Sequence, residues 1–185
     1  TSSVTPTALG AATPTDVTTA VNGIQIGGRN LLRNSNDFSK WTLNTAYSSI
    51  TNEGYLKYSD NPISNQFGPN NFLVSDPGYY TISFTCVEAT TSKISYEFKH
   101  TSGHGESQSQ VVAGKNVNTA YLEVGEYYGL SLFGNGTGSG YIILKNDIML
   151  ERSNKPSNWT PAPEDVDANI ATAQSTADAA LTRNN

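Results

Sequence analysis

Apolar and polar residues alternate through the middle of this chain, and a period of two predicts β-strands. Nine stretches carry the pattern and are expected as strands: 42–51, 54–59, 72–75, 79–88, 93–101, 106–113, 117–124, 126–134 and 141–151. Clusters of Asn, Gly, Asp and Pro separate these stretches and mark turns. No long helical pattern interrupts them, so the middle is expected to be an antiparallel all-β domain.

Alternate side chains of a strand lie on opposite faces, so each strand contributes one row to the interior. The residues expected inside are Tyr80, Ile82, Phe84, Cys86, Ile94, Tyr96, Phe98, Tyr128, Leu130, Leu132, Ile142, Leu144, Ile148 and Leu150. Short strands with turn signals at regular spacing are typical of two packed sheets. The predicted fold is therefore an antiparallel jelly-roll β-sandwich or a related sandwich.

Five aromatic residues fall on the opposite faces of these strands and are expected to point away from the main core. They are Tyr79, Tyr121, Tyr127, Phe133 and Tyr141. An outward aromatic row on one sheet can form a platform on which sugar rings stack. Alternatively, these rings pack beneath loops or terminal segments. The sequence leaves both interpretations open.

The ends of the chain differ from its middle and divide it into three parts. Residues 1–27 are expected to be a linker with a short helix, which begins at Thr13-Pro14 and carries Val17, Val21 and Ile24 at helical spacing. Residues 28–163 form the predicted sandwich. Residues 164–185 are expected to be a helical connector with a coiled-coil seam at Val166, Ile170, Ala173, Ala177 and Ala180.

Composition narrows the kinds of partner. The net charge is −5, charged residues make up 15 % of the chain, and no Lys/Arg cluster occurs, so nucleic acid is not expected. A surface rich in Ser, Thr, Asn, Gln, Gly and Tyr suits uncharged ligands such as sugars. No apolar run is long enough to cross a bilayer, so membrane insertion is not expected. Cys86 is the only cysteine, which excludes an intramolecular disulfide, and its apolar surroundings predict a buried thiol.

Few residues carry candidate chemistry. His100 and His104 are the only histidines and flank a Thr-Ser-Gly turn. Together with Glu106 they offer a zinc ligand set, but polar hairpin residues are the simpler interpretation, and hydrogen bonding at the rim of a ligand site is favoured over metal binding or catalysis. Glycoside hydrolysis needs two carboxylates facing a cleft, and nothing in the spacing pairs any. No nucleophile motif occurs, so the protein is expected to be non-catalytic.

Two motifs make a family resemblance visible. The stretch GRNLLRNSNDFSKWT, residues 28–42, resembles the opening of jelly-roll carbohydrate-binding modules, with Asn-Leu-Leu, a small polar turn, Phe and then Trp. The stretch YIILKNDIMLERSNKPSNWTPAPEDVD, residues 141–167, resembles their closing strand as found in tail and baseplate proteins of phages that infect Gram-positive bacteria. There a Leu-Glu pair, a short turn and Trp-x-Pro-x-Pro-Glu-Asp lead into an Ala/Ser/Thr/Gln-rich helix. The middle of the chain matches in strand pattern only.

The resemblance implies a non-catalytic carbohydrate-binding module of a siphophage tail or baseplate protein, either a distal tail, a tail-associated or a receptor-binding protein. Its expected place is the virion, at the tail tip and outside the bacterial cell wall. The expected partners are host cell-wall saccharide and other tail or baseplate proteins in an oligomeric assembly. The tyrosines would stack on sugar rings, with His100 and His104 among the hydrogen-bonding residues. The alternatives are a structural spacer or decoration domain of a tail fibre and a glycosidase fragment.

The resemblance also raises a structural calcium ion, and no other cofactor. Related cellulose- and xylan-binding modules bind calcium through an acid just after the opening Phe and an Asp in the closing strand. This chain has Ser39 at the first position and Asp147 at the second, with Asp37 near enough to substitute. Asp147 and Asp37 are therefore the calcium candidates, and capping of the strand's solvent face is the alternative for Asp147. Trp159 is expected to pack rather than to bind ligand.

Overall fold

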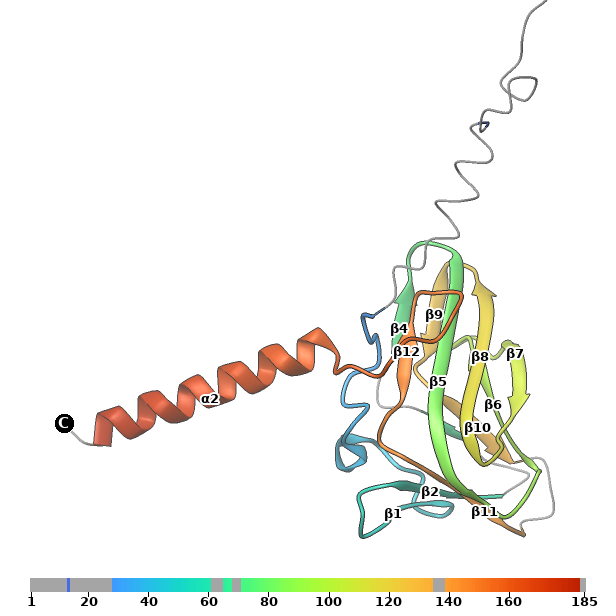
Figure 1. The fold of residues 1–185 in the computed structure, drawn as a ribbon, viewed down its shortest axis with the longest axis horizontal. Coiled ribbons are helices and arrows are strands. Elements are labelled where there is room, and N and C mark those ends of the chain that lie inside the picture. Colours follow the sequence, from blue (N-terminus) through green and yellow to red (C-terminus); the bar gives the residue numbers. More distant parts are fainter. Residues whose placement is uncertain (1–12, 14–27, 61–64, 68–70, 135–138, 184–185) are drawn as a thin grey trace, which may run out of the picture.

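The computed structural model describes residues 13, 28–60, 65–67, 71–134 and 139–183. The short helix expected over residues 13–24 lies outside the described residues, apart from Thr13. Within them the chain forms antiparallel sheets, a 3-10 helix η2 (Phe38–Lys40) and a C-terminal helix α2 (Pro163–Arg183). Figure 1 shows the sheets gathered into one body from which α2 projects.

Three sheets make up this body. The largest has the strand order β1-β2-β11-β5-β12, and β8 also pairs with β5. The strands of this sheet are β1 (Ser48–Ile50), β2 (Leu56–Ser59), β5 (Gly78–Ala89), β8 (Gly114–Leu122), β11 (Tyr141–Leu144) and β12 (Met149–Glu151). The second sheet has the order β3-β10-β6-β7, with β3 (Asn65–Phe67), β6 (Ile94–Lys99), β7 (Gly105–Gln110) and β10 (Ser131–Gly134). The third pairs β4 (Asn71–Val74) with β9 (Gly125–Tyr128).

The two larger sheets pack face to face around a common core. The ring centroid of Phe84 on β5 lies 4.8 Å from that of Tyr96 on β6. All the residues predicted to point inward are buried except Tyr128. Burial raises the pKa of Tyr96 to about 12, so its hydroxyl stays protonated in the core. The prediction of an antiparallel, sandwich-like all-β domain is thus confirmed.

Strand β5 is the spine of the six-stranded sheet. β8 pairs along one edge, and β12 and β11 share the other, β12 opposite Thr81 and β11 opposite Cys86. The prediction of one strand over 141–151 is therefore wrong, because the chain leaves the ladder after Leu144. Asp147 occupies the gap, where its carboxylate accepts hydrogen bonds from the backbone N (2.9 Å) and Oγ1 (2.7 Å) of Thr85. A side chain thus replaces the missing backbone partner.

The predicted strand over 126–134 is two strands in different sheets. β9 pairs with β4, whereas β10, which begins at Ser131, pairs with β3. The alternation of inward and outward side chains shifts by one position in the residues between these two strands. As a result Tyr127 is buried, at 3 % exposure, and its ring lies 5.7 Å from that of Phe72. The prediction that Tyr127 points outward and Tyr128 inward is wrong for this reason.

Other strand boundaries also differ from the prediction. Only Ser48–Ile50 of the stretch 42–51 is a strand. β3 lies in a part of the sequence where no strand is predicted. Leu31 and Leu32 do not form a strand, although the backbone N of Leu31 donates to the carbonyl of Leu150 at 2.7 Å. Leu32 is fully buried. The opening segment therefore contributes to the core without joining a sheet.

Helix α2 confirms the helix predicted from the proline-then-acid entry. It leads away from the sheets, and Val166 and Ile170 are 40 % and 62 % exposed. A helix with so few apolar contacts is only marginally stable by itself. Pairing of α2 with a further helix stays a prediction. In the part of the chain that the structure describes, no helix has the length and apolar character that a membrane span requires.

The thiol of Cys86 should be nearly inert in the native protein. It is 1 % exposed, and burial raises its pKa. Because the thiolate is the reactive form, we expect labelling by iodoacetamide near pH ~8 to be at least about tenfold slower in native protein than in urea-unfolded protein. Mass spectrometry of timed samples measures both rates. Complete labelling of the native chain at the unfolded rate would contradict the buried position.

Candidate functional site

Two of the predicted tyrosines form an exposed pair on the outer face of the six-stranded sheet. Tyr79 on β5 lies directly opposite Tyr121 on β8, and they are 55 % and 51 % exposed. Their ring centroids are 5.5 Å apart with an interplanar angle of 87°, an edge-to-face arrangement. Val117, at 41 % exposure, lies on the same face of β8. The pair therefore presents apolar ring surface and two hydroxyl-bearing rings to solvent, as predicted.

Tyr141 also points outward but belongs to a different surface. It begins β11, which pairs with the far end of β5 near Glu88 and Ala89, so it lies about 30 Å along β5 from Tyr79. The Nζ of Lys57 lies 3.8 Å from the centroid of its ring. Its hydroxyl donates to Oε1 of Glu88 at 2.7 Å, and this bond raises the pKa of Tyr141. Tyr141 is thus not part of a row with the Tyr79–Tyr121 pair, and a lysine already covers one face of its ring.

Phe133 lies on the second sheet instead. On β10 it is opposite Ser95 of β6 and is partly buried. On the same outer face, Glu97 accepts from Lys99 Nζ at 3.3 Å and from Ser131 Oγ at 3.4 Å. The side chain of Glu97 is only 11 % exposed. This surface is polar and well paired, and the structure does not bring Phe133 together with the tyrosine pair.

His100 and His104 belong to the turn between β6 and β7. The ring of His100 packs edge-on against Tyr127, with centroids 5.0 Å apart, and its Nδ1 accepts a hydrogen bond from the backbone N of Ser102 at 3.0 Å. The carbonyl of His104 accepts from the backbone N of His100 at 2.7 Å, and the His104 side chain is exposed. His100 therefore packs and shapes the turn. Among the described residues, no group of three His, Cys, Asp or Glu side chains is placed to hold a metal.

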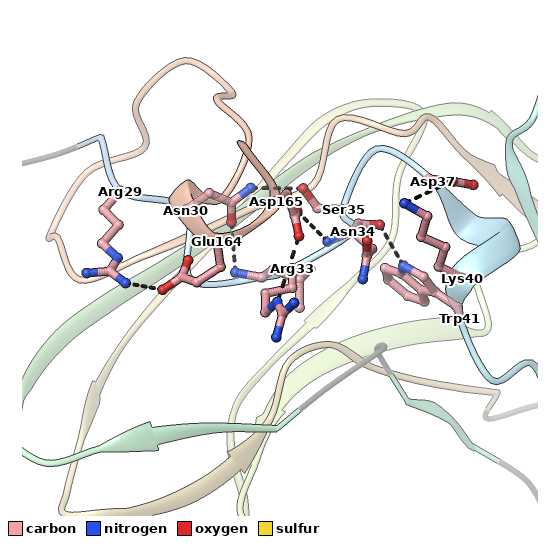
Figure 2. Close-up of polar contacts among 11 residues, drawn as sticks. Arg29, Asn30, Arg33, Asn34, Ser35, Asp37, Lys40, Trp41, Glu164 and Asp165 are labelled. Carbon is pink, nitrogen blue, oxygen red and sulfur yellow. Dashed lines mark hydrogen bonds and ion pairs between the residues drawn. The ribbon is translucent and has the colours of Figure 1, made fainter. Parts of the chain in front are cut away.

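The opening and closing motifs meet in one polar cluster, which we call the clasp: Gly28, Arg29, Asn30, Arg33, Asn34, Ser35, Glu151, Ser157, Thr160, Glu164 and Asp165. Figure 2 shows the part of the clasp beside the start of α2. The segment that leads into the sandwich and the segment that leaves it lie side by side here, since Thr160 Oγ1 donates to the carbonyl of Gly28 at 3.0 Å. Residues more than a hundred positions apart thus converge on one spot.

Asn30 is the centre of the clasp. Its side chain is fully buried, and its Nδ2 donates to Ser35 Oγ (2.9 Å) and to the carbonyls of Ile148 (3.0 Å) and Thr160 (3.0 Å). Its Oδ1 accepts from the backbone N atoms of Leu32 (3.0 Å) and Leu150 (3.1 Å). One side chain therefore joins the opening segment, β12 and the exit before α2.

Glu151 holds the other side of the clasp. It is 1 % exposed, yet its carboxylate accepts from Ser157 N (2.6 Å), Ser157 Oγ (2.9 Å) and Gly28 N (3.2 Å). A buried carboxylate is tolerated when donors surround it in this way. Glu151 therefore anchors two segments: the loop after β12, through Ser157, and the start of the described sandwich, through Gly28.

The base of α2 is tied to the opening segment rather than to a sheet. Asp165 Oδ2 accepts from the backbone N of Asn34 at 2.6 Å, and Asp165 Oδ1 lies 3.8 Å from Arg33 Nε. Glu164 pairs with Arg29. Glu164 and Asp165 stabilise the N-terminus of α2, because negative charge interacts favourably with the positive end of the helix dipole. Their partners in the opening segment orient the helix on the sandwich (Figure 2). The direction of α2 is therefore set by these contacts.

Both tryptophans of the motifs pack and donate hydrogen bonds within the same region. Trp41 is 6 % exposed, and its Nε1 donates to the carbonyl of Asn34 at 2.9 Å. Trp159 is half-buried, and its Nε1 donates to Ser35 Oγ at 3.1 Å. The packing role expected for Trp159 agrees with these contacts.

The two calcium candidates lie in neighbouring segments, since Asn146 Nδ2 donates to the carbonyl of Asn36 at 3.1 Å. Each carboxylate already has protein donors. Asp37 accepts from Ser39 N (3.1 Å) and Ser39 Oγ (2.5 Å), and the hydroxyl contact lowers its pKa. Asp147 is bonded through both oxygens to Thr85. Neither carboxylate therefore needs a cation to balance it, and calcium at this pair stays a prediction.

Sequence reasoning missed Asn30 and Glu151 as structural centres, although both lie inside the motifs that carry the resemblance. The available signal was a polar residue directly beside buried leucines, at Asn30-Leu31-Leu32 and Leu150-Glu151. A scan against protein-family models gives no match for this sequence, and a search of curated proteins gives none either.

Proposed function

We propose that this chain is a non-catalytic carbohydrate-binding module with a jelly-roll sandwich, carried by a tail or baseplate protein of a phage that infects Gram-positive bacteria. In this proposal it attaches the virion to host cell-wall polysaccharide. The observation that carries the proposal is the exposed Tyr79–Tyr121 pair, at 55 % and 51 % exposure on the outer face of the six-stranded sheet. The motifs at residues 28–42 and 141–167 support the phage context by resemblance alone.

The chemistry of the pair suits a neutral sugar. The C–H face of a pyranose packs on an aromatic ring, while the phenol hydroxyls offer donors and acceptors to sugar hydroxyls. Thr119, between Val117 and Tyr121 on the same face of β8, bonds through its hydroxyl to Thr81 at 2.8 Å and adds polar surface beside the rings. Such a small contact area gives modest affinity for one site. Several copies on one tail would supply avidity.

Helix α2 supports the idea of a mounted module. It leaves the clasp as an exposed helix with a heptad-like seam, a form suited to joining neighbouring copies in a stalk. Oligomerisation, location at the tail tip and contact with other tail proteins are parts of the same proposal.

A structural spacer is the second candidate, and the clasp favours it. The buried hydrogen bonds of Asn30 and Glu151 hold the two ends of the sandwich together, and the acids of α2 bond to the opening segment. Such an arrangement holds the segments before and after the sandwich in a fixed relative position, whether or not the sheets bind a ligand. Binding to cell walls separates the two candidates.

Replacing both tyrosines of the pair by alanine should abolish most wall binding. If each ring contributes about 0.7–1.4 kcal/mol, as aromatic contacts do, the double variant Tyr79→Ala/Tyr121→Ala loses about 10- to 100-fold in affinity for purified Gram-positive cell walls. Co-sedimentation of the tagged protein with walls measures this loss. The unfolding temperature should stay close to that of wild type, because both rings are half exposed.

Tyr141→Ala is the matched control, since Tyr141 is a surface tyrosine at the far end of β5 and is covered by Lys57. It should bind walls like wild type. If wild-type protein labels no Gram-positive wall preparation, or if the double variant binds as well as wild type, the tyrosine-pair proposal is wrong. Release of reducing sugar from the walls would instead favour the glycosidase alternative.

A further inference from the structure

Asp60 stands out as a buried carboxylate at one end of the sandwich. It directly follows β2 and continues the inward row of Leu56 and Tyr58, and it is 2 % exposed. Its backbone N donates to the carbonyl of Gly140 at 2.9 Å, next to the start of β11. The chain is thus fixed on both strands here, and the carboxylate is aimed toward the interior.

Neither oxygen of this carboxylate has a hydrogen-bond partner among the described residues. None of the ion pairs formed by described residues includes Asp60. Glu151, equally buried, has three donors. An ionised carboxylate without donors or a counter-charge is strongly disfavoured in an interior, so the geometry calls for a positive partner at Asp60.

The described side chains nearby do not supply that partner. Lys57, on the same strand, points to the opposite face and lies over the ring of Tyr141 at 3.8 Å. Tyr58 shares the inward row, and burial raises its pKa to about 12, so its hydroxyl is neutral. The described residues at this strand end therefore leave the Asp60 carboxylate without a counter-charge or a hydrogen-bond donor.

We propose that Asp60 is the carboxylate ligand of a hard-cation site, of the calcium class, at this end of the sandwich. Calcium accepts carboxylate oxygens together with backbone carbonyls and water, so one aspartate is sufficient to anchor it. With a single charged ligand the affinity falls in the weak range of extracellular modules, with Kd on the order of 10⁻⁴–10⁻³ M. This site is separate from the Asp37 and Asp147 candidates, whose carboxylates already have donors, and it does not depend on saccharide binding.

Thermal unfolding tests the proposal. Calcium at about 10 mM should raise the unfolding temperature of wild type by roughly 3–10 °C over the same protein in EDTA. Asp60→Asn keeps the side-chain volume and removes the charge, so the variant should fold and show no calcium-dependent rise. Terbium(III), a calcium surrogate, should give tyrosine-sensitised luminescence with wild type because Tyr58 is the preceding inward residue. The Asp60→Asn variant should lose that signal.

The matched control is Asp147→Asn, which changes the other calcium candidate. It should retain the calcium-dependent rise and the terbium signal. Magnesium and sodium salts at equal ionic strength distinguish a specific site from general screening. An unchanged unfolding temperature together with no terbium signal would overturn the proposal. Loss of both responses in Asp147→Asn, with Asp60→Asn unaffected, would place the ion at Asp147 instead.

Discussion

Asn30→Ala is expected to lower the free energy of unfolding by about 3–5 kcal/mol, a large share of the stability of a domain of this size. The substitution removes five hydrogen bonds at a fully buried position. It leaves the backbone N atoms of Leu32 and Leu150 and the carbonyl of Ile148 without the partners they have now. Each buried polar group left unpaired costs about 1–3 kcal/mol, which partial entry of water reduces.

Urea unfolding followed by tryptophan fluorescence measures this effect well, because Trp41 and Trp159 both hydrogen-bond to the opening segment. Asn158→Ala is the matched control: Asn158 lies near the same exit but is exposed, and the change should stay within about 0.5 kcal/mol. A loss below about 1 kcal/mol for Asn30→Ala would show that the clasp does not depend on this side chain.

Glu151→Gln is expected to cost about 2–4 kcal/mol. The native carboxylate accepts from Ser157 N, Ser157 Oγ and Gly28 N while almost fully buried. Glutamine has one acceptor oxygen, and its amide group would face donors instead of acceptors. Hydrogen bonds to a charged group are worth about 1.5–3 kcal/mol each, so their partial loss accounts for this range. Limited proteolysis should also cut the 152–158 segment faster than in wild type, because Ser157 loses its anchor.

Glu123→Gln tests whether the effect belongs to the buried position, since Glu123 is exposed. It should unfold like wild type and be cleaved at the same rate. If Glu151→Gln is equally stable and equally resistant, then the loop after β12 is held by other contacts, such as the bond from Thr81 Oγ1 to the carbonyl of Ser153.

The clasp and tyrosine variants separate architecture from binding. Clasp changes should lower stability, and any remaining folded protein should bind walls with normal affinity. Tyrosine changes should do the reverse, because Tyr79 and Tyr121 make few buried contacts. If neither the wild type nor any variant binds walls, the spacer candidate is favoured; if the wild type binds and the tyrosine variants bind equally well, another surface of the protein makes the contact.

Much of the fold follows from local patterns in the sequence. Alternation places Tyr80, Ile82 and Phe84 inside because a strand has a side-chain period of two, whatever its neighbours. The helix after Pro163 follows from a proline and two acids at its start. The alternation of side chains along a strand also places Tyr79 and Tyr121 on the outer face, as predicted.

Alternation fails where a strand ends unnoticed. The residues between β9 and β10 break the period, so Tyr127 enters the core beside Phe72 while Leu130 and Leu132 also stay inside. Likewise, the ladder gap at Asp147 divides the closing stretch into β11 and β12. Each break depends on which strand lies alongside.

The sequence by itself therefore determined an antiparallel β domain, its C-terminal helix and the outward position of the tyrosine pair. The tertiary structure alone decided that Tyr141 and Phe133 lie on other surfaces, that Asn30 and Glu151 join the two ends of the sandwich, and that the buried Asp60 carboxylate has no hydrogen-bond partner among the described residues. The reason is physical. Side-chain direction within a strand is a local property, whereas burial of a polar group and its donors depend on segments brought together from distant parts of the chain.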